Sequence, residues 1–273
     1  MNSSLSVYCM SMLLLASIVL TACSAPRPTE QPKIIFQSDD TAQQANWPPE
    51  KIAPNYEALA RDLVRQKHYE VALGQLNMAL EEGPGSAEVY YLQGVCLRET
   101  DRPEEALASF AKALQYDPKY ARAYNGMGLV HVKDDLFGKA IEAFTRAVEL
   151  DPARADFINN LGYAYLMDKQ FTQAEHFFIR SLAIDSEYTT ARNNLALCYG
   201  FVQRDKDAFK VLREKAPAQV AYHNMAVIYR LVGKHTKAAE AEQKAISLNK
   251  EAAEGAPGAA TEENFLEPKP TPY

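Results

Sequence analysis

The sequence has few of the residues that mark catalytic, metal-binding or disulfide-rich proteins. Its 273 residues include four cysteines, five histidines and one tryptophan. Four cysteines spread along the chain do not make a disulfide framework. The histidines are scattered without metal-ligand spacing, and no Gly-x-Ser-x-Gly motif or catalytic carboxylate pair stands out. We therefore expect no enzyme activity, no metal site and no cofactor.

Basic stripes and bilayer-spanning apolar runs are also missing. The formal net charge is -6, and charges of both signs are interspersed along most of the chain, so nucleic acid is not an expected partner. The apolar stretch at residues 10–22 is shorter than the roughly 20 residues that cross a bilayer. Its length is typical of the apolar region of an export signal.

This stretch ends in Leu20-Thr21-Ala22-Cys23, which resembles the lipobox of bacterial lipoproteins, Leu-x-Ala-Cys. The resemblance implies that Cys23 receives a diacylglyceryl group, that the chain is cleaved before it, and that the new amine is acylated. Each buried methylene of such an anchor contributes about 0.8 kcal/mol. Residues 1–8 lack the Lys or Arg usual in export signals. An ordinary export signal with an incidental cysteine is the alternative interpretation.

Composition divides the chain into four segments. We expect a lipoprotein signal peptide at 1–22, a lipidated tether at 23–52, a repeat region at 53–250 and a disordered acidic tail at 251–273. Five prolines interrupt any helix in the tether. The tail is rich in Ala, Glu, Gly and Pro. Trp47, at the end of the tether, is expected to pack on the first repeat; contact with a partner is the alternative.

The repeat region has a period of 34 residues. The first copy carries Tyr56, Leu59, Ala60, Leu63, Ala72, Leu76, Ala79 and Pro84; the next carries Tyr90, Gln93, Gly94, Leu97, Ala106, Phe110, Ala113 and Pro118. Two more copies keep this register, the fifth is shortened, and the pattern resumes at Tyr222. It resembles the tetratricopeptide repeat. The resemblance implies an all-α superhelical solenoid of about six helix-turn-helix units.

Packing accounts for the recurring residues. Small residues at Gly94 and Ala106 lie where the two helices of a unit approach most closely. Prolines such as Pro118 end the second helices, and aspartates such as Asp101 and Asp135 are expected to cap their starts. Glu242 replaces the core residue of the last unit, so its second helix, about 237–248, is the expected polar cap.

Two cysteines of the repeat region share one register position. Cys96 and Cys198 lie 102 residues apart, which is three repeats. Stacked helices at 8–10 Å spacing hold them beyond the roughly 7 Å limit for a disulfide. We therefore expect buried thiols that do not pair with each other.

Asparagine recurs in the first helices of the units, although it is a poor helix former. The residues are Asn125, Asn159, Asn160, Asn193, Asn194 and Asn224. An asparagine amide can bond both sides of a peptide group. By resemblance to repeat proteins that bind extended peptides, these residues are expected to form a partner-binding groove on the concave face. The alternative is that they bond to neighbouring helices or to water.

Among repeat-containing lipoproteins, the chain resembles the TadD family of Tad (Flp) pilus assembly lipoproteins. The resemblance is carried by Asn159–Tyr163, Ala191–Leu197 and the shortened fifth repeat. It implies a periplasmic scaffold, lipid-anchored in the outer membrane, that binds a secretin or another pilus component. Anchoring in the inner membrane is the alternative location. Alternative functions are an adaptor or pilotin for type IV pili or barrel assembly, and a regulator of a periplasmic hydrolase or peptidoglycan synthase.

Overall fold

The computed structural model describes residues 55–255, with side chains up to residue 250, and this part contains helices and no strand. The helices are α1 (Tyr56–Arg65), α2 (Tyr69–Glu82), α3 (Ala87–Glu99), α4 (Pro103–Tyr116), α5 (Ala121–Lys133), α6 (Phe137–Leu150), α7 (Ala155–Met167), α8 (Phe171–Ile184), α9 (Thr189–Phe201), α10 (Asp205–Arg213), α11 (Ala218–Leu231) and α12 (His235–Gly255). They form six helix-turn-helix units, so the predicted all-α solenoid is confirmed. Cys23, the tether, Trp47 and the tail beyond residue 255 lie outside the described residues.

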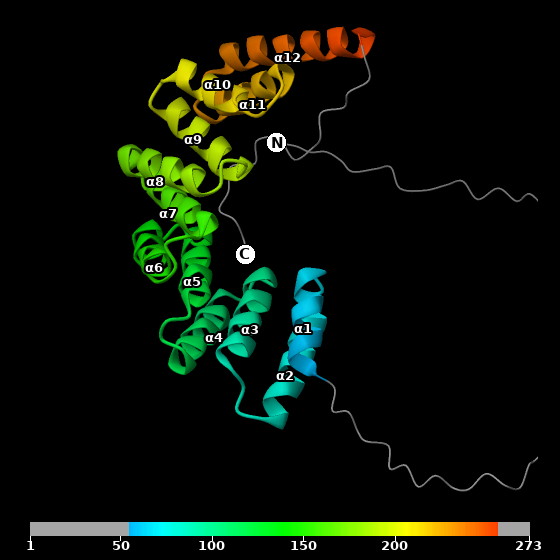
Figure 1. The fold of residues 1–273 in the computed structure, drawn as a ribbon, viewed down its shortest axis with the longest axis vertical. Helices are drawn as coiled ribbons and strands as arrows, with labels where there is room; N and C mark the ends of the chain where they lie inside the picture. Colours follow the sequence, from blue (N-terminus) through cyan, green and yellow to red (C-terminus); the bar gives the residue numbers. More distant parts are fainter. Residues whose placement is uncertain (1–54, 256–273) are drawn as a thin grey trace, which may run out of the picture. The chain divides into compact units, whose positions relative to one another are not determined.

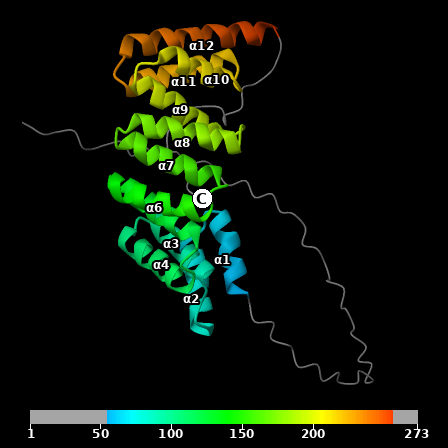
Figure 2. The same cartoon turned by 60° about the vertical axis from the view of Figure 1, so that its left-hand side comes forward.

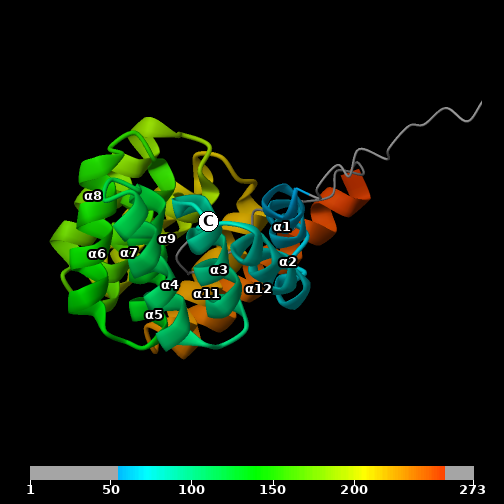
Figure 3. The same cartoon turned by 90° about the horizontal axis from the view of Figure 1, so that it is seen from below.

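The units stack in sequence order from α1 to α12 (Figures 1 and 2). Each odd-numbered helix contacts the next odd-numbered helix as well as its own partner. Seen along the stack, α7 and α9 lie inside α6 and α8 (Figure 3). The odd-numbered helices therefore form a continuous inner layer, and their exposed side chains are the ones that can meet a ligand. None of the helices within residues 55–255 is both long and apolar enough to cross a bilayer.

A glycine in each central unit makes room for an aromatic ring. A Cβ added at Gly128 in α5 would lie 2.5 Å from the ring of Phe144 in α6. The same conflict recurs one repeat earlier, where Gly94 would meet Phe110 at 2.6 Å. Both rings are fully buried. The predicted small residue is thus required by the phenylalanine of the second helix, which fills the space between the pair.

The turns between the two helices of a unit also repeat. Each of the first five turns has one non-glycine residue with φ between 56° and 62°, and the sixth has Gly233 with φ 77°. The non-glycine residues are Lys67, Asp101, Asp135, Lys169 and Gln203. The amide after each bonds back to the last turn of the preceding helix; for example, the Arg102 amide donates to the Leu97 carbonyl at 2.9 Å. This is the Schellman arrangement, which ends a helix sharply.

The predicted role of the turn aspartates is wrong. Asp101 and Asp135 are the left-handed turn residues themselves, not helix caps. The residues that precede α4 and α6 are Arg102 and Leu136, and neither makes a side-chain capping bond. The Schellman bond already fixes the chain direction at these turns, so no side-chain cap is needed to redirect it.

The positions at which the second helices end follow the sequence pattern in the first units and depart from it in the last. Pro84, Pro118 and Pro152 each follow an even-numbered helix within two residues of its end, as predicted. The fifth unit is short, because α10 has 9 residues where α8 has 14. The last helix is longer than predicted and runs to Gly255. Its Glu242 is half-buried, and its Oε1 lies at hydrogen-bond distance, 3.2 Å, from Nδ1 of His223.

The two cysteines of the repeat region are buried and unpaired, as predicted. Burial raises the pKa of the Cys96 thiol from 9.0 to about 12, with a further contribution from the nearby Glu70 carboxylate. Burial and the Glu175 carboxylate raise the pKa of Cys198 to about 12 as well. Both side chains therefore stay protonated at neutral pH and act as apolar core residues.

The glycine contact generates a stability prediction. Gly128→Ala forces a Cβ against the Phe144 ring, so the free energy of unfolding should fall by about 1–3 kcal/mol in chemical denaturation. The matched control is Gly74→Ala, an exposed position in the middle of α2 with nothing within 4 Å of the added Cβ. It should raise stability by about 0.5–1 kcal/mol. Equal effects of the two substitutions would contradict the packing account.

The thiols generate a pH prediction. A raised pKa keeps the thiol neutral below about pH 12, so the thiolate fraction at pH 8 is about a thousandfold lower than for an unshifted cysteine. Iodoacetamide should leave Cys96 and Cys198 unmodified in the folded protein at pH 8, as read by peptide mass spectrometry. Both should react fully in denaturant, and rapid native labelling would refute their burial.

Candidate functional site

Asparagines of the inner helices form a hydrogen-bonded ladder between units. Asn160 Nδ2 in α7 donates to Asn125 Oδ1 in α5 at 3.0 Å, and Asn194 Nδ2 in α9 donates to Asn159 Oδ1 at 3.0 Å. Within α7, Asn159 Nδ2 donates to Asn160 Oδ1 at 3.3 Å, which joins the two links. The ladder thus connects α5, α7 and α9 through side chains alone.

A further link carries the ladder to α11. There, Asn224 Nδ2 donates to Asn193 Oδ1 at 3.4 Å. All six asparagines are buried, with exposed fractions of 4% or less. The side chains of the predicted groove are therefore buried and hydrogen-bonded between repeats. Their binding of a partner's backbone stays a prediction.

An open cleft of about 500 Å³ lies on the inner layer beside the first four odd-numbered helices. We call it the arginine cleft; it is lined by Arg61, Val64, Arg65, Tyr91, Leu92, Val95, Arg122 and Arg154. Its floor is apolar and buried, with Val95 only 1% exposed. The side chains of Arg61, Arg122 and Arg154 are 40–42% exposed. The lining contains four guanidinium groups and no carboxylate.

Carboxylates behind the cleft hold these arginines in place. Glu88 bonds both Arg61 Nε at 3.4 Å and Arg122 Nη1 at 3.0 Å. Asp156 accepts two bonds from Arg154, at 2.8 and 2.5 Å. Each guanidinium has five N–H donors, so donors are left over for another carboxylate. The cleft is therefore a pre-positioned set of donors for an acidic group.

Aromatic rings stiffen one wall of the cleft. The Arg122 guanidinium carbon lies 4.3 Å from the centre of the Tyr91 ring, within the range of a cation–π contact. The Tyr91 and Tyr120 rings lie 5.6 Å apart, and the Tyr120 hydroxyl donates to Glu88. Burial and this bond raise the pKa of Tyr120, so its hydroxyl stays a donor. Arg122 is thus held between a ring and a carboxylate.

The sequence-based reasoning missed the arginine cleft. One repeat before Arg122 lies Glu88, and one repeat after Arg61 lies Val95, so the arginines do not recur with the period. The periodic signal directed attention to the asparagines instead. A search for basic residues on the inner faces of the first helices would have found Arg61 and Arg65, but not their convergence with Arg154.

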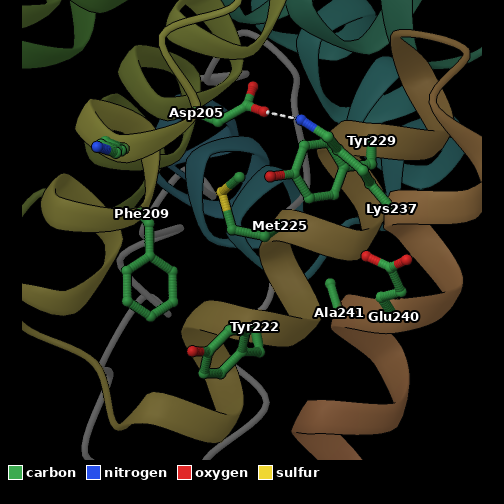
Figure 4. A pocket seen from close by; sticks show the side chains of 9 residues that line it. Asp205, Phe209, Tyr222, Met225, Tyr229, Lys237, Glu240 and Ala241 are labelled. Carbon is green, nitrogen blue, oxygen red and sulfur yellow. Dashed lines mark hydrogen bonds and ion pairs between the residues drawn. The ribbon is translucent and has the colours of Figure 1, made fainter.

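A second cavity, of about 460 Å³, lies between α10, α11 and α12. The Phe209 and Tyr222 rings lie 4.7 Å apart at one side, with Met225 on the floor (Figure 4). At the mouth, Asp205 bonds Lys237 Nζ at 2.7 Å and Lys234 Nζ at 3.0 Å. The short helix α10 forms one side of this cavity. Within residues 55–255, no three His, Cys, Asp or Glu side chains are grouped as a metal site.

Comparison with protein families identifies the repeat along most of the described region. Three models described as tetratricopeptide repeat match residues 57–121, 143–176, and 121–154 together with 220–251. The matched residues cover more than half of the chain. A search of curated protein sequences gives no match.

Solved structures with the same fold include several bacterial repeat proteins. Pseudomonas aeruginosa pilF is 20% identical, with a TM-score of 0.57 over 73% of this chain and 92% of its own. A Parabacteroides merdae tetratricopeptide repeat protein is 18% identical, with a TM-score of 0.57 over 70% and 78%. YrrB, described as a TPR protein with an unusual peptide-binding site, is 26% identical, with a TM-score of 0.50 over 65% and 94%. The first two likenesses concern the fold alone.

The ladder generates a stability prediction. Asn159→Ala removes the acceptor of Asn194 Nδ2, so a buried donor loses its partner and the free energy of unfolding should fall by about 1–3 kcal/mol. The control is Asn77→Ala on the exposed face of α2, which should change stability by less than about 0.5 kcal/mol. Urea denaturation measures both, and a silent Asn159→Ala would show that the ladder does not support the stack.

Proposed function

Because the chain belongs to the tetratricopeptide-repeat family, we propose that it is a scaffold that binds an extended acidic segment of a partner protein in the arginine cleft. Proteins built from this repeat are generally interaction scaffolds and not enzymes. The observation that carries the proposal is the convergence of Arg61, Arg65, Arg122 and Arg154 on one apolar-floored cleft. The peptide-binding site named for YrrB supports a peptide as the kind of ligand.

The chemistry of the cleft defines the partner segment. Guanidinium groups bind carboxylates with charge-assisted bonds that are about twice as strong as neutral ones. The buried floor of Val64, Leu92 and Val95 offers little polar contact, so an apolar or aromatic side chain between acidic residues matches it best. The asparagine ladder holds the inner helices together, which keeps the arginines at constant spacing. The expected ligand is thus an extended segment with acidic and apolar residues.

We further propose that the scaffold is anchored to a membrane through lipid on Cys23 and works in the periplasm, at the outer membrane. The support is the lipobox-like Leu20-Thr21-Ala22-Cys23 after an apolar stretch. Residues 24–54 link this cysteine to α1 in the sequence.

A role in assembling or localising a Tad (Flp) pilus secretion apparatus is the specific form of this proposal. It is supported by the likeness of Asn159–Tyr163, Ala191–Leu197 and the short fifth repeat to the TadD family. The expected partner is a secretin or another pilus assembly component. An adaptor for type IV pili or barrel assembly, or a regulator of a periplasmic hydrolase or peptidoglycan synthase, would have the same cleft but a different partner.

The cleft generates a binding prediction. Arg122→Ala combined with Arg154→Ala should weaken binding of a short labelled peptide, rich in glutamate with one phenylalanine and no basic residue, by about tenfold or more. We call this ligand the acidic probe peptide. Affinity should also fall as salt screens the exposed charges. Fluorescence anisotropy measures both effects.

The matched control for this test is Arg146→Ala combined with Lys139→Ala. Both residues lie on the outer helix α6; Arg146 pairs with Glu149 and is 52% exposed, and Lys139 is exposed. The control removes the same two positive charges without touching the cleft, so affinity should be unchanged. An equal loss with this control would reduce the effect to net charge and refute the cleft.

The anchor generates a localisation prediction. Cys23→Ser removes the acceptor thiol, so the protein should move from the membrane to the soluble periplasmic fraction and lose incorporation of labelled palmitate. Mass spectrometry of proteins that co-purify with the anchored form should recover a secretin or pilus component, and Cys23→Ser should lose it. Unchanged fractionation would refute the lipid anchor, while recovery of a hydrolase or barrel-assembly subunit would replace the pilus role.

A further inference from the structure

Acidic residues gather in the C-terminal segment, opposite in charge to the arginine cleft. Residues 256–273 contain Glu262, Glu263 and Glu267 against a single Lys269. The same stretch contains one adjacent apolar pair, Phe265-Leu266, between the second and third glutamates. This alternation of acidic and apolar residues is the chemistry that the cleft is expected to bind.

We propose that residues 256–273 of the same chain occupy the arginine cleft until a partner's acidic segment displaces them. This inference rests on the proposed function, because the tail and the partner compete for one site. It makes the cleft a regulated surface, since the affinity for a partner then depends on how firmly the chain's own tail is held.

The charges and the floor of the cleft match the tail. Arg61 pairs with Glu57 at 2.8 Å and with Glu88 at 3.4 Å, and Arg122 pairs with the same Glu88, whose side chain is 19% exposed. These ion pairs use a minority of the N–H donors of the two guanidinium groups, so donors remain that a further carboxylate can accept. Arg65 is 71% exposed and its bond to Asp62, at 3.3 Å, is on the surface, where ion pairs are weak. A glutamate pair followed by Phe265 can therefore meet both the arginines and the apolar floor.

The tail is long enough to reach the cleft. The near edge of the cleft is Arg154, before α7, and Arg122 is at the start of α5; α11, the partner of α12, is two inner helices from α7 and three from α5. Packed helices lie 8–10 Å apart, so these separations along the stack are about 20 Å and about 30 Å. The eight residues from 256 to 263 span up to about 28 Å when extended, and the ten residues to Phe265 span up to about 35 Å. Figures 1 and 3 both show the far end of α12 on the side of the stack where α1 lies.

Attachment to the same chain makes the tail an effective competitor. A segment joined by a short connection experiences an effective concentration in the millimolar range. A weak contact that would be undetectable between separate molecules is then occupied most of the time. A partner must bind more tightly than the tail, or the tail's charges must be changed.

The test compares binding of the acidic probe peptide to the full chain and to a tail-neutral variant. The tail-neutral variant carries Glu262→Gln, Glu263→Gln and Glu267→Gln, which follow α12 in the sequence and replace no residue of the solenoid. It should bind the probe about tenfold more tightly than the wild type. Adding Arg122→Ala to it should abolish the gain. The matched control, Glu81→Gln, Glu82→Gln and Glu149→Gln, changes net charge equally at exposed positions and should leave affinity unchanged.

The outcomes separate the two proposals. Equal, Arg122-dependent binding to the wild type and the tail-neutral variant would overturn the tail as occupant and keep the cleft as a binding site. No binding to either chain would overturn the cleft itself. An equal gain in the charge-matched control would reduce the effect to overall charge.

A photo-crosslinker in place of Phe265 gives a second readout. It should react with peptides of α1, α3 or α5 within one molecule, seen as crosslinked monomer. Crosslinks to α10 or α12, or between two chains, would overturn the proposal, because the tail would then occupy the end cavity or a second copy.

Discussion

The packing of a phenylalanine ring against a backbone without a Cβ determines the distance between the helices of each central unit. In α5 and α6 this contact joins Gly128 to Phe144, and no larger residue fits without moving the ring. Because the contact recurs every 34 residues, successive units repeat the same geometry and their first helices form one inner layer. Everything that the inner layer presents, including the cleft, depends on this repeated spacing.

Two polar systems are built on that layer, and they do different work. The asparagine ladder is buried and bonds unit to unit. Hydrogen bonds need defined geometry, so the ladder fixes how successive inner helices are aligned in an otherwise apolar stack. The arginine cleft is half-exposed, and its guanidinium groups are held from behind by Glu88 and Asp156. The ladder fixes the helices, and the helices carry the exposed guanidinium donors. The result is a rigid recognition surface, which lowers the entropic cost of binding.

Much of the fold could be predicted from the sequence, because packing imposes a period that the residues must follow. The helices, the proline stops, the short fifth unit and the buried Cys96 and Cys198 all came from that period. The turn residues did not, since a lysine or glutamine such as Lys169 or Gln203 carries no local signal for a left-handed conformation. The length of α12 was also missed, because the composition after residue 250 resembles a tail.

In the candidate site, too, the residues that recur with the period could be predicted and those that do not recur could not. The asparagines recur with the period, so the sequence identifies them. Whether their side chains are buried depends on how successive units pack on one another, and the sequence of a single repeat carries no information about that. The cleft arginines come from two helices, α1 and α5, and from the residue before α7, and they do not recur, so only the folded chain brings Arg61, Arg122 and Arg154 together. Periodicity reports the framework of a repeat protein, whereas its binding surface is made by departures from the period.

Hydrogen–deuterium exchange of the tail-neutral variant of the full chain, with and without the acidic probe peptide at low and high salt, tests the central claim most directly. The account predicts added protection confined to α1, α3, α5 and the start of α7, lost at high salt. Protection on the outer helices or around α10 to α12, or none while the peptide binds, would contradict the arginine cleft as the recognition surface.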